Sequence, residues 1–322
     1  MTTQPSVSAE RELRLRVRAR RDVTARIAEF VLEDVAGYRL PPWAPGAHIN
    51  LRLDGGDRQF SLCGDPRETD RYRIAVLREE QGRGGSAWIH DHLQHGDAIT
   101  AGAPLNHFEL EPAGSYHLIA AGVGITPILP MAAQLERRGA NWRLTYLGHG
   151  FAAMAYLDEL QCYGKKVTLW SSTERRHRAA PQEILAQMVP GEAVYACGPE
   201  SLLVGLEEAL ASTATDLHLE RFAPKDRTRL EETGETFEVE LGRSGELLSI
   251  LPGVSILEAI EATGLQPDYS CREGTCGTCE TRILAGHADH RDSILTPEEQ
   301  ADDEVMMICV SRSKSPRLVL DI

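Results

Sequence analysis

The sequence predicts a multidomain fold with an antiparallel β-barrel, an α/β domain built on a parallel sheet, and a small C-terminal domain. Three observations support this prediction. Short strands separated by turn residues precede Ser115, strands and helices alternate after it, and four cysteines gather near the C-terminus. The chain has 322 residues, enough for two or three domains. We expect the barrel over 1–112, the α/β domain over 113–225, a linker over 226–234 and the C-terminal domain over 235–322.

The part before Ser115 consists of short strands with Pro, Gly and Asp at the turns. RELRLRVRARRDVTARIAEFVLED begins the series, and PPWAPGAHINLRL and RYRIAVLRE continue it. Evenly spaced strands with such turns are typical of a small barrel. A single helix is expected within it, at SAWIHDHL.

The α/β pattern starts with the apolar run SYHLIAA, a glycine-rich turn and the helical segment PILPMAAQLERRG. Further helices are expected at MAYLDELQCYG, PQEILAQM and SLLVGLEEALAS, with apolar strands between them. This alternation predicts a parallel sheet with helices on both faces. After the polar stretch APKDRTRLEETGE, TFEVELGRSGELLSIL predicts a hairpin, SILEAIEATG a helix, and VMMICVS and RLVLDI two closing strands.

Charge and composition limit the class of protein. With 34 basic and 48 acidic residues the net charge is −14, which argues against nucleic acid as a partner because phosphate binding needs a basic surface. From Glu235 to Ile322 there are 17 acidic and 7 basic residues, an excess that either steers a basic partner or only maintains solubility. The N-terminal segment lacks the apolar core of a signal peptide, and no apolar run could span a bilayer. We therefore expect a cytoplasmic protein without membrane contact.

Four of the seven cysteines have the spacing of a metal centre. Cys271, Cys276 and Cys279 form the pattern C-x4-C-x2-C, and 29 residues separate Cys279 from Cys309. This is the plant-type [2Fe–2S] spacing, in which four thiolates from a loop and a strand hold two irons. Small residues such as Gly274 let backbone N–H groups reach the cluster sulfurs. Structural zinc is the alternative, although zinc cysteines usually come as two short-spaced pairs.

Two turns of the α/β domain are candidates for binding a nucleotide. GVGITP, with Gly122, Gly124 and Thr126, follows a strand and opens a helix, where N–H groups and the helix dipole favour a phosphate. It lacks the third glycine of the dinucleotide fingerprint, so in isolation it is equally an ordinary helix-entry turn. The turn that contains Cys197 and Gly198 follows a later strand, and a lone buried cysteine is usually only a small apolar side chain.

One barrel loop is a candidate for binding a phosphate, although in isolation it is more simply a plain loop, and a nearby segment in isolation is more simply an edge strand. RQFSL places Arg58, Phe60 and Ser61 at the end of an expected strand. GRGGS offers N–H groups, a hydroxyl and a guanidinium just before a helix, which suits a phosphate monoester. The candidate residues of this loop are Arg83, Gly84, Gly85 and Ser86.

Together these motifs resemble the phthalate dioxygenase reductase-like family of the ferredoxin–NADP reductase superfamily. SCREGTCGTC resembles the loop of a plant-type ferredoxin, a β-grasp domain, and HRDSILTPEEQ…MMICVSRS resembles vanillate O-demethylase reductases and their relatives. The order of flavin barrel, nucleotide domain and ferredoxin covers nearly the whole chain. The resemblance therefore implies an NAD(P)H-dependent oxidoreductase with FMN, or alternatively FAD, and a [2Fe–2S] cluster.

The resemblance also implies roles for single residues. Arg58 would contact the flavin phosphate, Phe60 would pack beside the isoalloxazine in place of the usual Tyr, and Ser61 would lie near flavin N5. The glycine turn would hold the pyrophosphate of NADH, and the Cys-Gly turn would lie near the nicotinamide. The catalytic candidates are Ser61, Thr126 and Cys197.

Weaker candidates are TERRHR, which is either a site for an NADPH 2′-phosphate or a solvated loop, and Glu220 and Phe222, which the family places near the flavin. The strand end LGHG lacks an arginine that would mark NADPH. The implied function is electron transfer from NADH through FMN and the cluster to a terminal Rieske-type oxygenase, such as an O-demethylase or an aromatic or quaternary-amine oxygenase. The alternatives are a reductase for a non-Rieske monooxygenase and a redox-sensing ferredoxin-like binding module.

Overall fold

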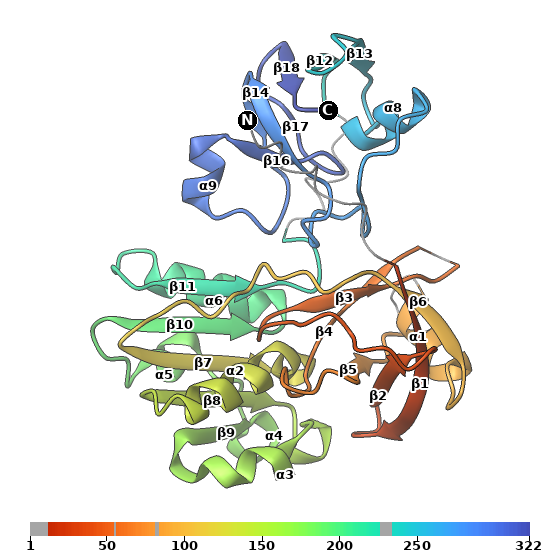
Figure 1. Ribbon diagram of the computed structural model, residues 1–322. Coiled ribbons are helices and arrows are strands. Elements are labelled where there is room, and N and C mark those ends of the chain that lie inside the picture. The colour runs from red at the N-terminus through yellow and green to blue at the C-terminus, as the bar shows by residue number, and fades with distance from the viewer. Residues whose placement is uncertain (1–11, 55, 81–83, 226–233) are drawn as a thin grey trace. The chain divides into compact units, whose positions relative to one another are not determined.

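The computed structural model describes residues 12–54, 56–80, 84–225 and 234–322. They form two compact units, one within Glu10–Glu220 and the other within Arg221–Ile322. The first unit contains the barrel and the α/β domain, and the second contains the C-terminal domain (Figure 1). The expected linker, 226–234, lies outside the described residues except for Gly234.

The barrel is a six-stranded antiparallel sheet of order β4-β3-β6-β1-β2-β5. Leu62, directly after β4, bridges to Ile74 in β5, so the two edges of the sheet nearly meet. Alternate side chains of β1, among them Leu15 and Val17, face the core because side chains alternate along a strand. The elements are β1 (Leu13–Asp22), β2 (Ile27–Asp34), β3 (His48–Leu51), β4 (Arg58–Ser61), β5 (Tyr72–Leu77), α1 (Gly85–His92) and β6 (Ala98–Ala101).

The α/β domain has a parallel sheet of order β11-β10-β7-β8-β9. Leu118 and Ala120 of β7 pack with α2 on one face, whereas Ile119 packs with α5 and α6 on the other. The strands are β7 (Ser115–Ala121), β8 (Trp142–Gly148), β9 (Val167–Ser171), β10 (Glu192–Cys197) and β11 (Leu217–Glu220). The helices are η1 (Gly122–Gly124), α2 (Ile125–Arg137), η2 (Phe151–Ala153), α3 (Leu157–Leu160), η3 (Gln161–Lys166), α4 (Ser172–Arg175), α5 (Pro181–Leu185) and α6 (Glu200–Leu210).

The single helix expected at MAYLDELQCYG is replaced by the short helices α3 and η3, so that prediction was wrong. Tyr156, directly before α3, adopts a left-handed backbone with φ +60°, and Gly164 interrupts η3 with φ +53°. A left-handed residue cannot continue a right-handed helix.

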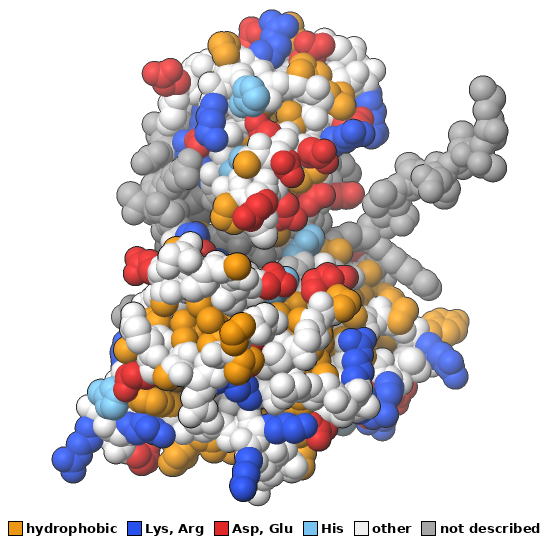
Figure 2. All heavy atoms as spheres, turned by 90° about the vertical axis from the view of Figure 1, so that its left-hand side faces the viewer, with side chains coloured by type: hydrophobic (Ala, Val, Ile, Leu, Met, Phe, Trp, Pro, Cys, Tyr) orange, Lys and Arg blue, Asp and Glu red, His pale blue; other side chains and the backbone are white. Residues whose placement is uncertain are grey.

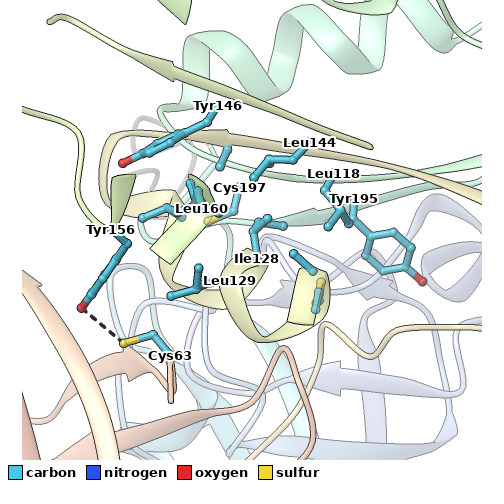
Figure 3. Packing of buried hydrophobic residues seen from close by; sticks show 14 of the residues in the cluster. Cys63, Leu118, Ile128, Leu129, Leu144, Tyr146, Tyr156, Leu160, Tyr195 and Cys197 are labelled. Atoms are coloured by element: carbon cyan, nitrogen blue, oxygen red, sulfur yellow. Dashed lines mark hydrogen bonds between the residues drawn. The ribbon is translucent and has the colours of Figure 1, made fainter. Parts of the chain in front are cut away.

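One apolar core continues from the barrel into the α/β domain. Ile27, Cys63 and Ala75 of the barrel belong to the same buried cluster as Ile128 of α2. Figure 3 shows Cys63 facing Tyr156, whose hydroxyl lies 3.6 Å from the Cys63 Sγ. Burial raises the pKa of the Cys63 thiol to about 11, so the thiol packs there as a neutral group.

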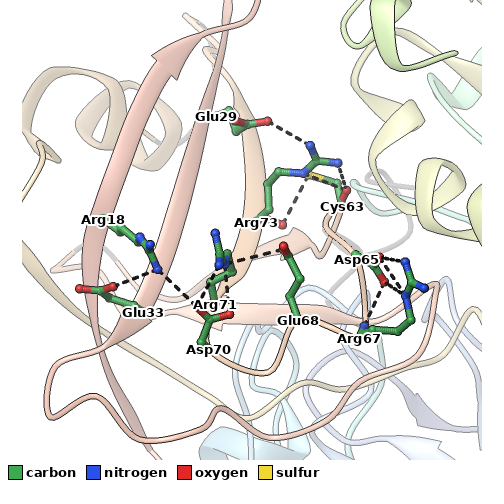
Figure 4. Close-up of polar contacts among 10 residues, drawn as sticks. All are labelled: Arg18, Glu29, Glu33, Cys63, Asp65, Arg67, Glu68, Asp70, Arg71 and Arg73. Carbon is green, nitrogen blue, oxygen red and sulfur yellow. Dashed lines mark hydrogen bonds and ion pairs between the residues drawn. The ribbon is translucent and has the colours of Figure 1, made fainter. Parts of the chain in front are cut away.

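Polar contacts reinforce the same junction. Arg73 of β5 donates to the carbonyl oxygen of Cys63 and pairs with both oxygens of Glu159 in α3, at 2.8 and 3.0 Å. Figure 4 shows Arg73 between Cys63 and Glu29, whose carboxylate lies 3.7 Å from the guanidinium. The barrel and the α/β domain are therefore tied together both by packing and by charge.

The second unit has a mixed five-stranded sheet of order β13-β12-β18-β14-β16, with α8 packed on it as in a β-grasp fold. Its central pair, β12 and β18, is parallel, and the other pairs are antiparallel. The elements are β12 (Phe237–Leu241), β13 (Leu247–Ile250), α8 (Ile256–Ala262), β14 (Glu280–Ala285), β15 (Ala288–Asp289), α9 (Pro297–Asp302), β16 (Val305–Met307), β17 (Arg312–Ser313) and β18 (Arg317–Leu320).

Candidate active site and metal centre

Arg58 lies where strand β4 meets the start of helix α1. A Cβ atom added to Gly85 would lie 2.6 Å from the Nε atom of Arg58, so the arginine side chain passes directly over the glycine backbone. The guanidinium donates to the carbonyl oxygen of Asp57 at 2.8 Å, which holds its direction. The structure thus brings together Arg58 and the loop that the sequence predicts to bind phosphate.

The N-terminus of α1 has the chemistry of an anion site. Gly84 adopts a left-handed backbone with φ +84°, and within the described part of the chain no side chain caps the first N–H groups. The Ser86 hydroxyl accepts the N–H of Glu79 at 3.0 Å, which leaves its proton available for donation. With Arg58 alongside, these groups suit a phosphate monoester. Arg83, predicted for the same loop, lies outside the described residues.

Replacing Arg58 with Ala is expected to weaken flavin binding about 10-fold or more, because a charge-assisted hydrogen bond contributes roughly 1.5–3 kcal/mol. The measurement is the flavin remaining after dialysis, read by absorbance. Arg67→Ala is the matched control, since this exposed arginine pairs only with Asp65 among the ion pairs of the described residues. Equal flavin content in both variants would contradict the role of Arg58.

Ser61, Cys197 and Glu220 form a cluster across the junction of the two domains. The Ser61 hydroxyl donates to the Oε2 atom of Glu220 at 3.4 Å, although 159 positions separate them in the sequence. Parallel pairing of β10 with β11 sets Cys197 beside Glu220. Phe60, the neighbour of Ser61, is half-buried and packs against the barrel core. Phe222, the weaker candidate from the same segment as Glu220, belongs to the other compact unit.

Burial determines the protonation state of this cluster. Desolvation raises the pKa of the Glu220 carboxyl to about 8, against the lowering effect of the hydrogen bond from Ser61. Desolvation, with the nearby Glu220, also raises the pKa of the Cys197 thiol well above its ordinary value. Glu220 is therefore protonated at neutral pH, and Cys197 is a neutral, fully buried thiol rather than a nucleophile.

The pKa of Glu220 predicts a pH-dependent stability. The unfolded carboxyl ionises near pH 4.5 and the folded one near pH 8, so the folded state binds more protons between these values and stability falls as pH rises. Between pH 5 and 9 the Tm of the wild type is expected to fall further than the Tm of the Glu220→Gln variant, and the two decreases should differ by roughly 5 °C. Glu208→Gln, at an exposed position of α6, serves as the control. Parallel pH profiles for the wild type and the Glu220 variant would refute the raised pKa.

The two turns predicted to bind a nucleotide touch each other. A Cβ atom on Gly124 would overlap the carbonyl oxygen of Cys197 and lie 2.9 Å from the nitrogen of Gly198. Gly122 adopts φ +56°, and the Thr126 hydroxyl donates to the carbonyl oxygen of Val123 at 2.9 Å, which closes the turn. Both turns follow the carboxyl ends of adjacent parallel strands, where open α/β sheets bind their ligands.

The cysteine quartet lies in the second unit, and all four side chains are buried and reduced. Cys271 contacts the side chains of Cys276 and Cys309, and Cys309 also contacts Cys279, so the sulfurs form a chain of neighbours. These contacts hold the pKa of the Cys271 thiol far below its ordinary value. Among the described residues, no three His, Cys, Asp or Glu side chains are arranged to enclose a single metal ion. Cys309 follows strand β16 in a turn, not within the strand expected from VMMICVS.

The cluster loop has the backbone that such a centre needs. Gly274 and Gly277 adopt φ +67° and +75°, which L-residues rarely take. The N–H of Glu273 donates to the Cys271 Sγ at 3.3 Å, and the N–H of Cys271 lies 3.5 Å from the Cys276 Sγ. Four buried thiols and inward N–H groups fit a [2Fe–2S] cluster.

Three features define the class of protein as flavin- and iron–sulfur-dependent reductases. They are a barrel with an anion site, a nucleotide-type turn that contacts Cys197, and a loop with four cysteines. Residues 239–314 match the family described as "2Fe-2S iron-sulfur cluster binding domain". The chain belongs to the phthalate dioxygenase reductase-like family of oxygenase reductase subunits. It is thus an oxidoreductase that passes electrons from NAD(P)H through a flavin and a [2Fe–2S] cluster to an oxygenase.

Three comparisons support the family assignment. The chain is 40% identical to the carnitine monooxygenase reductase subunit of Escherichia coli (strain K12), over 93% of this chain and 95% of that protein. It is 39% identical to the heme-dependent oxidative N-demethylase beta subunit of Ectopseudomonas mendocina (strain ymp), over 96% and 99%. The solved structure of phthalate dioxygenase reductase, described as "a modular structure for electron transfer from pyridine nucleotides to [2Fe-2S]", superimposes with a TM-score of 0.69 at 35% identity, covering 97% and 98% of the two chains.

In the part of the chain that the structure describes, every helix is too short or too polar to cross a bilayer.

Proposed function

We propose that the protein transfers electrons from NADH through FMN and a [2Fe–2S] cluster to a Rieske-type oxygenase. The observation that supports this function best is the cluster of Ser61, Cys197 and Glu220 beside the turn of Gly124. Hydride transfer requires donor and acceptor in contact and shielded from water, and these residues bring buried and half-buried side chains together at the junction of the barrel and the α/β domain. When bound, the flavin supplies the change from two-electron to one-electron chemistry.

The chain's own residues would have distinct tasks in this reaction. Ser61 would orient the protonated Glu220, whose carboxyl would offer a hydrogen-bond donor to the flavin, and Cys197 would supply a small neutral surface for the nicotinamide. The turn of Gly122, Gly124 and Thr126 would hold the pyrophosphate. We assign the flavin to 1–112, the nucleotide to 113–225 and the cluster ligands Cys271, Cys276, Cys279 and Cys309 to 235–322.

FMN is favoured over FAD by the anion site at α1. Arg58 and the N-terminal N–H groups, with Gly84, Gly85 and Ser86, suit a terminal phosphate with two negative charges better than a bridging pyrophosphate. Flavin released by heat from the purified protein should therefore be FMN. Recovery of FAD instead would contradict the assignment.

NADH is favoured over NADPH by the segment after β9. Arg175 lies over the ring of Trp170 at 4.1 Å, and the hydroxyls of Ser172 and Thr173 donate to the carbonyl oxygen of His149. These groups are engaged locally, so they do not form a ready site for a 2′-phosphate. Since NADH is a cytoplasmic reductant, we also propose a cytoplasmic location. Separate titrations with NADH and NADPH test the preference, and equal KM values would contradict it.

The surface of this protein that binds the oxygenase is expected to be acidic. Figure 2 shows acidic side chains gathered on one face of the second unit, and α9, just before Cys309, exposes Glu298, Glu299 and Asp302. A second candidate partner is a haem-containing oxygenase, because one relative is named as a subunit of a heme-dependent N-demethylase. Reconstitution with Rieske-type and haem oxygenases over a salt series tests both. Turnover with only the haem partner would replace the first proposal, and a salt-independent rate would exclude acidic steering.

A further inference from the structure

A buried group of two carboxylates and one imidazole lies in the second unit. His290 donates from Nε2 to the Oδ1 atom of Asp303 at 3.1 Å, and its Nδ1 lies 3.8 Å from the Oδ1 atom of Asp292. The side chains of Asp292, His290 and Asp303 are 0%, 3% and 16% exposed. The other oxygen of Asp292 accepts the N–H groups of Ile294 and Leu295, at 3.1 and 2.8 Å.

Two polar atoms of this group lack a hydrogen-bond partner in the described part of the chain. Among the described residues, Nδ1 of His290 and Oδ1 of Asp292 have no hydrogen-bond partner, although both are buried. A buried carboxylate without full compensation is costly, and stability alone would favour a neutral side chain at position 292. The free-energy cost of burying the Asp292 carboxylate points to a function for its charge.

Asp292 packs directly on the cluster loop. A Cβ atom on Gly274, between Cys271 and Cys276, would lie 3.0 Å from the Cα atom of Asp292. The N–H of Ser293, the next residue, donates to the carbonyl oxygen of Gly274 at 2.9 Å. The same added Cβ would meet Val310, which follows Cys309, at 2.6 Å. The segment that contains Asp292 therefore touches the cluster loop and the residue beside the fourth cysteine.

The cationic side chains near Asp292 contact other groups. Arg291 pairs with Asp289 at 2.8 Å. The Arg312 guanidinium lies over the ring of Phe237 and donates to the carbonyl oxygens of Val254 and Glu235. His287 pairs with Asp303 from the exposed side. Among these groups, His290 is the one whose ring faces the Asp292 carboxylate.

We propose that Asp292 is a positioning residue for the electron outlet: held by the N–H groups of Ile294 and Leu295, it fixes the cluster loop and places a buried negative charge that makes the [2Fe–2S] cluster harder to reduce. The inference rests on the proposed ligation of the cluster by Cys271, Cys276, Cys279 and Cys309. Reduction adds one electron to an already anionic cluster, and a fixed negative charge nearby opposes it more in a poorly solvated site than in water. A cluster held at lower potential is a stronger donor to the oxygenase.

The test is a redox titration of the full-length, flavin- and iron-loaded protein, followed by the EPR signal of the reduced cluster. Asp292→Asn removes the charge but keeps an oxygen that accepts the N–H groups of Ile294 and Leu295. We expect the cluster to become about 10-fold easier to reduce, which corresponds to roughly 59 mV for one electron. Glu298→Gln, an equal change of charge at an exposed site on α9, should change the equilibrium by less than about twofold.

The shift should persist at 0.5 M salt, because a buried charge is screened little. No shift in the Asp292 variant with an unaltered EPR spectrum, or an equal shift in the Glu298 variant, would overturn the proposal. If the Asp292→Asn variant loses its cluster, the Asp303→Asn variant is tested in its place. Position 303 has a left-handed backbone with φ +55°, which Asn tolerates. A smaller rise in potential is then expected, and an unchanged potential would overturn the proposal. Iron analysis of the wild type separates this result from failure of the proposed function, which would appear as a protein without iron.

Discussion

Cys276→Ala is expected to lower NADH-dependent reduction of cytochrome c by at least about 100-fold, while reduction of ferricyanide changes less than about twofold. Cys276 is buried, and its Sγ contacts Cys271, so the change removes one of four convergent ligands. In the proposed relay, cytochrome c would take electrons from the cluster, whereas ferricyanide would take them from the flavin directly. The two stopped-flow rates, measured on the same preparation, separate loss of the outlet from loss of the flavin.

Cys162→Ala is the matched control for this experiment. Its thiol is exposed and donates to the carbonyl oxygen of Glu159, and Cys162 belongs to the compact unit that does not contain the cluster loop. Both activities should be retained in this variant. Survival of both activities in the Cys276 variant would refute the ligand assignment.

Gly124→Ala is expected to slow NADH-dependent flavin reduction by about 100-fold or more, with flavin content unchanged. The added methyl group would overlap the Cys197 carbonyl oxygen and lie 2.5 Å from its carbonyl carbon. Both obstructing atoms are backbone, so relief requires separating the glycine turn from the Cys-Gly turn. In the proposed function the nucleotide contacts both turns, so a shift of about 1 Å would misplace it.

Gly114→Ala provides the control, because a Cβ atom there meets nothing within 4 Å and the backbone has no left-handed φ. This variant should reduce its flavin at the wild-type rate. Normal flavin reduction by NADH in the Gly124 variant would show that the contact between the two turns does not matter for hydride transfer.

Much of the architecture is visible in the sequence because the relevant signals are local. The alternation of strands and helices predicts the parallel sheet, and the C-x4-C-x2-C spacing places three thiols on one loop of the second unit. The same local reading fails near Tyr156, where a left-handed residue replaces a continuous helix. Apolar periodicity reports which face a segment buries, but not whether one backbone angle interrupts it.

Site residues differ in how far the sequence alone can specify them. Arg58 and Gly85 are each parts of short motifs, yet their contact depends on how β4 meets α1. Glu220 is a weak candidate in the sequence, since nothing near it signals a desolvated carboxyl. Its raised pKa arises from desolvation at the junction of the two domains, where it meets Ser61, 159 positions away in the sequence.

The class of this protein can be inferred from its sequence because the family resemblance rests on local features: the strand and helix pattern, the two turns and the cysteine spacing. Which of these features lie together depends on the folded structure. It set Gly124 against Cys197, Ser61 against Glu220, and Asp292 against the loop of Gly274. The physical reason is that burial, close approach and pKa depend on surroundings supplied by distant segments, which local patterns do not specify.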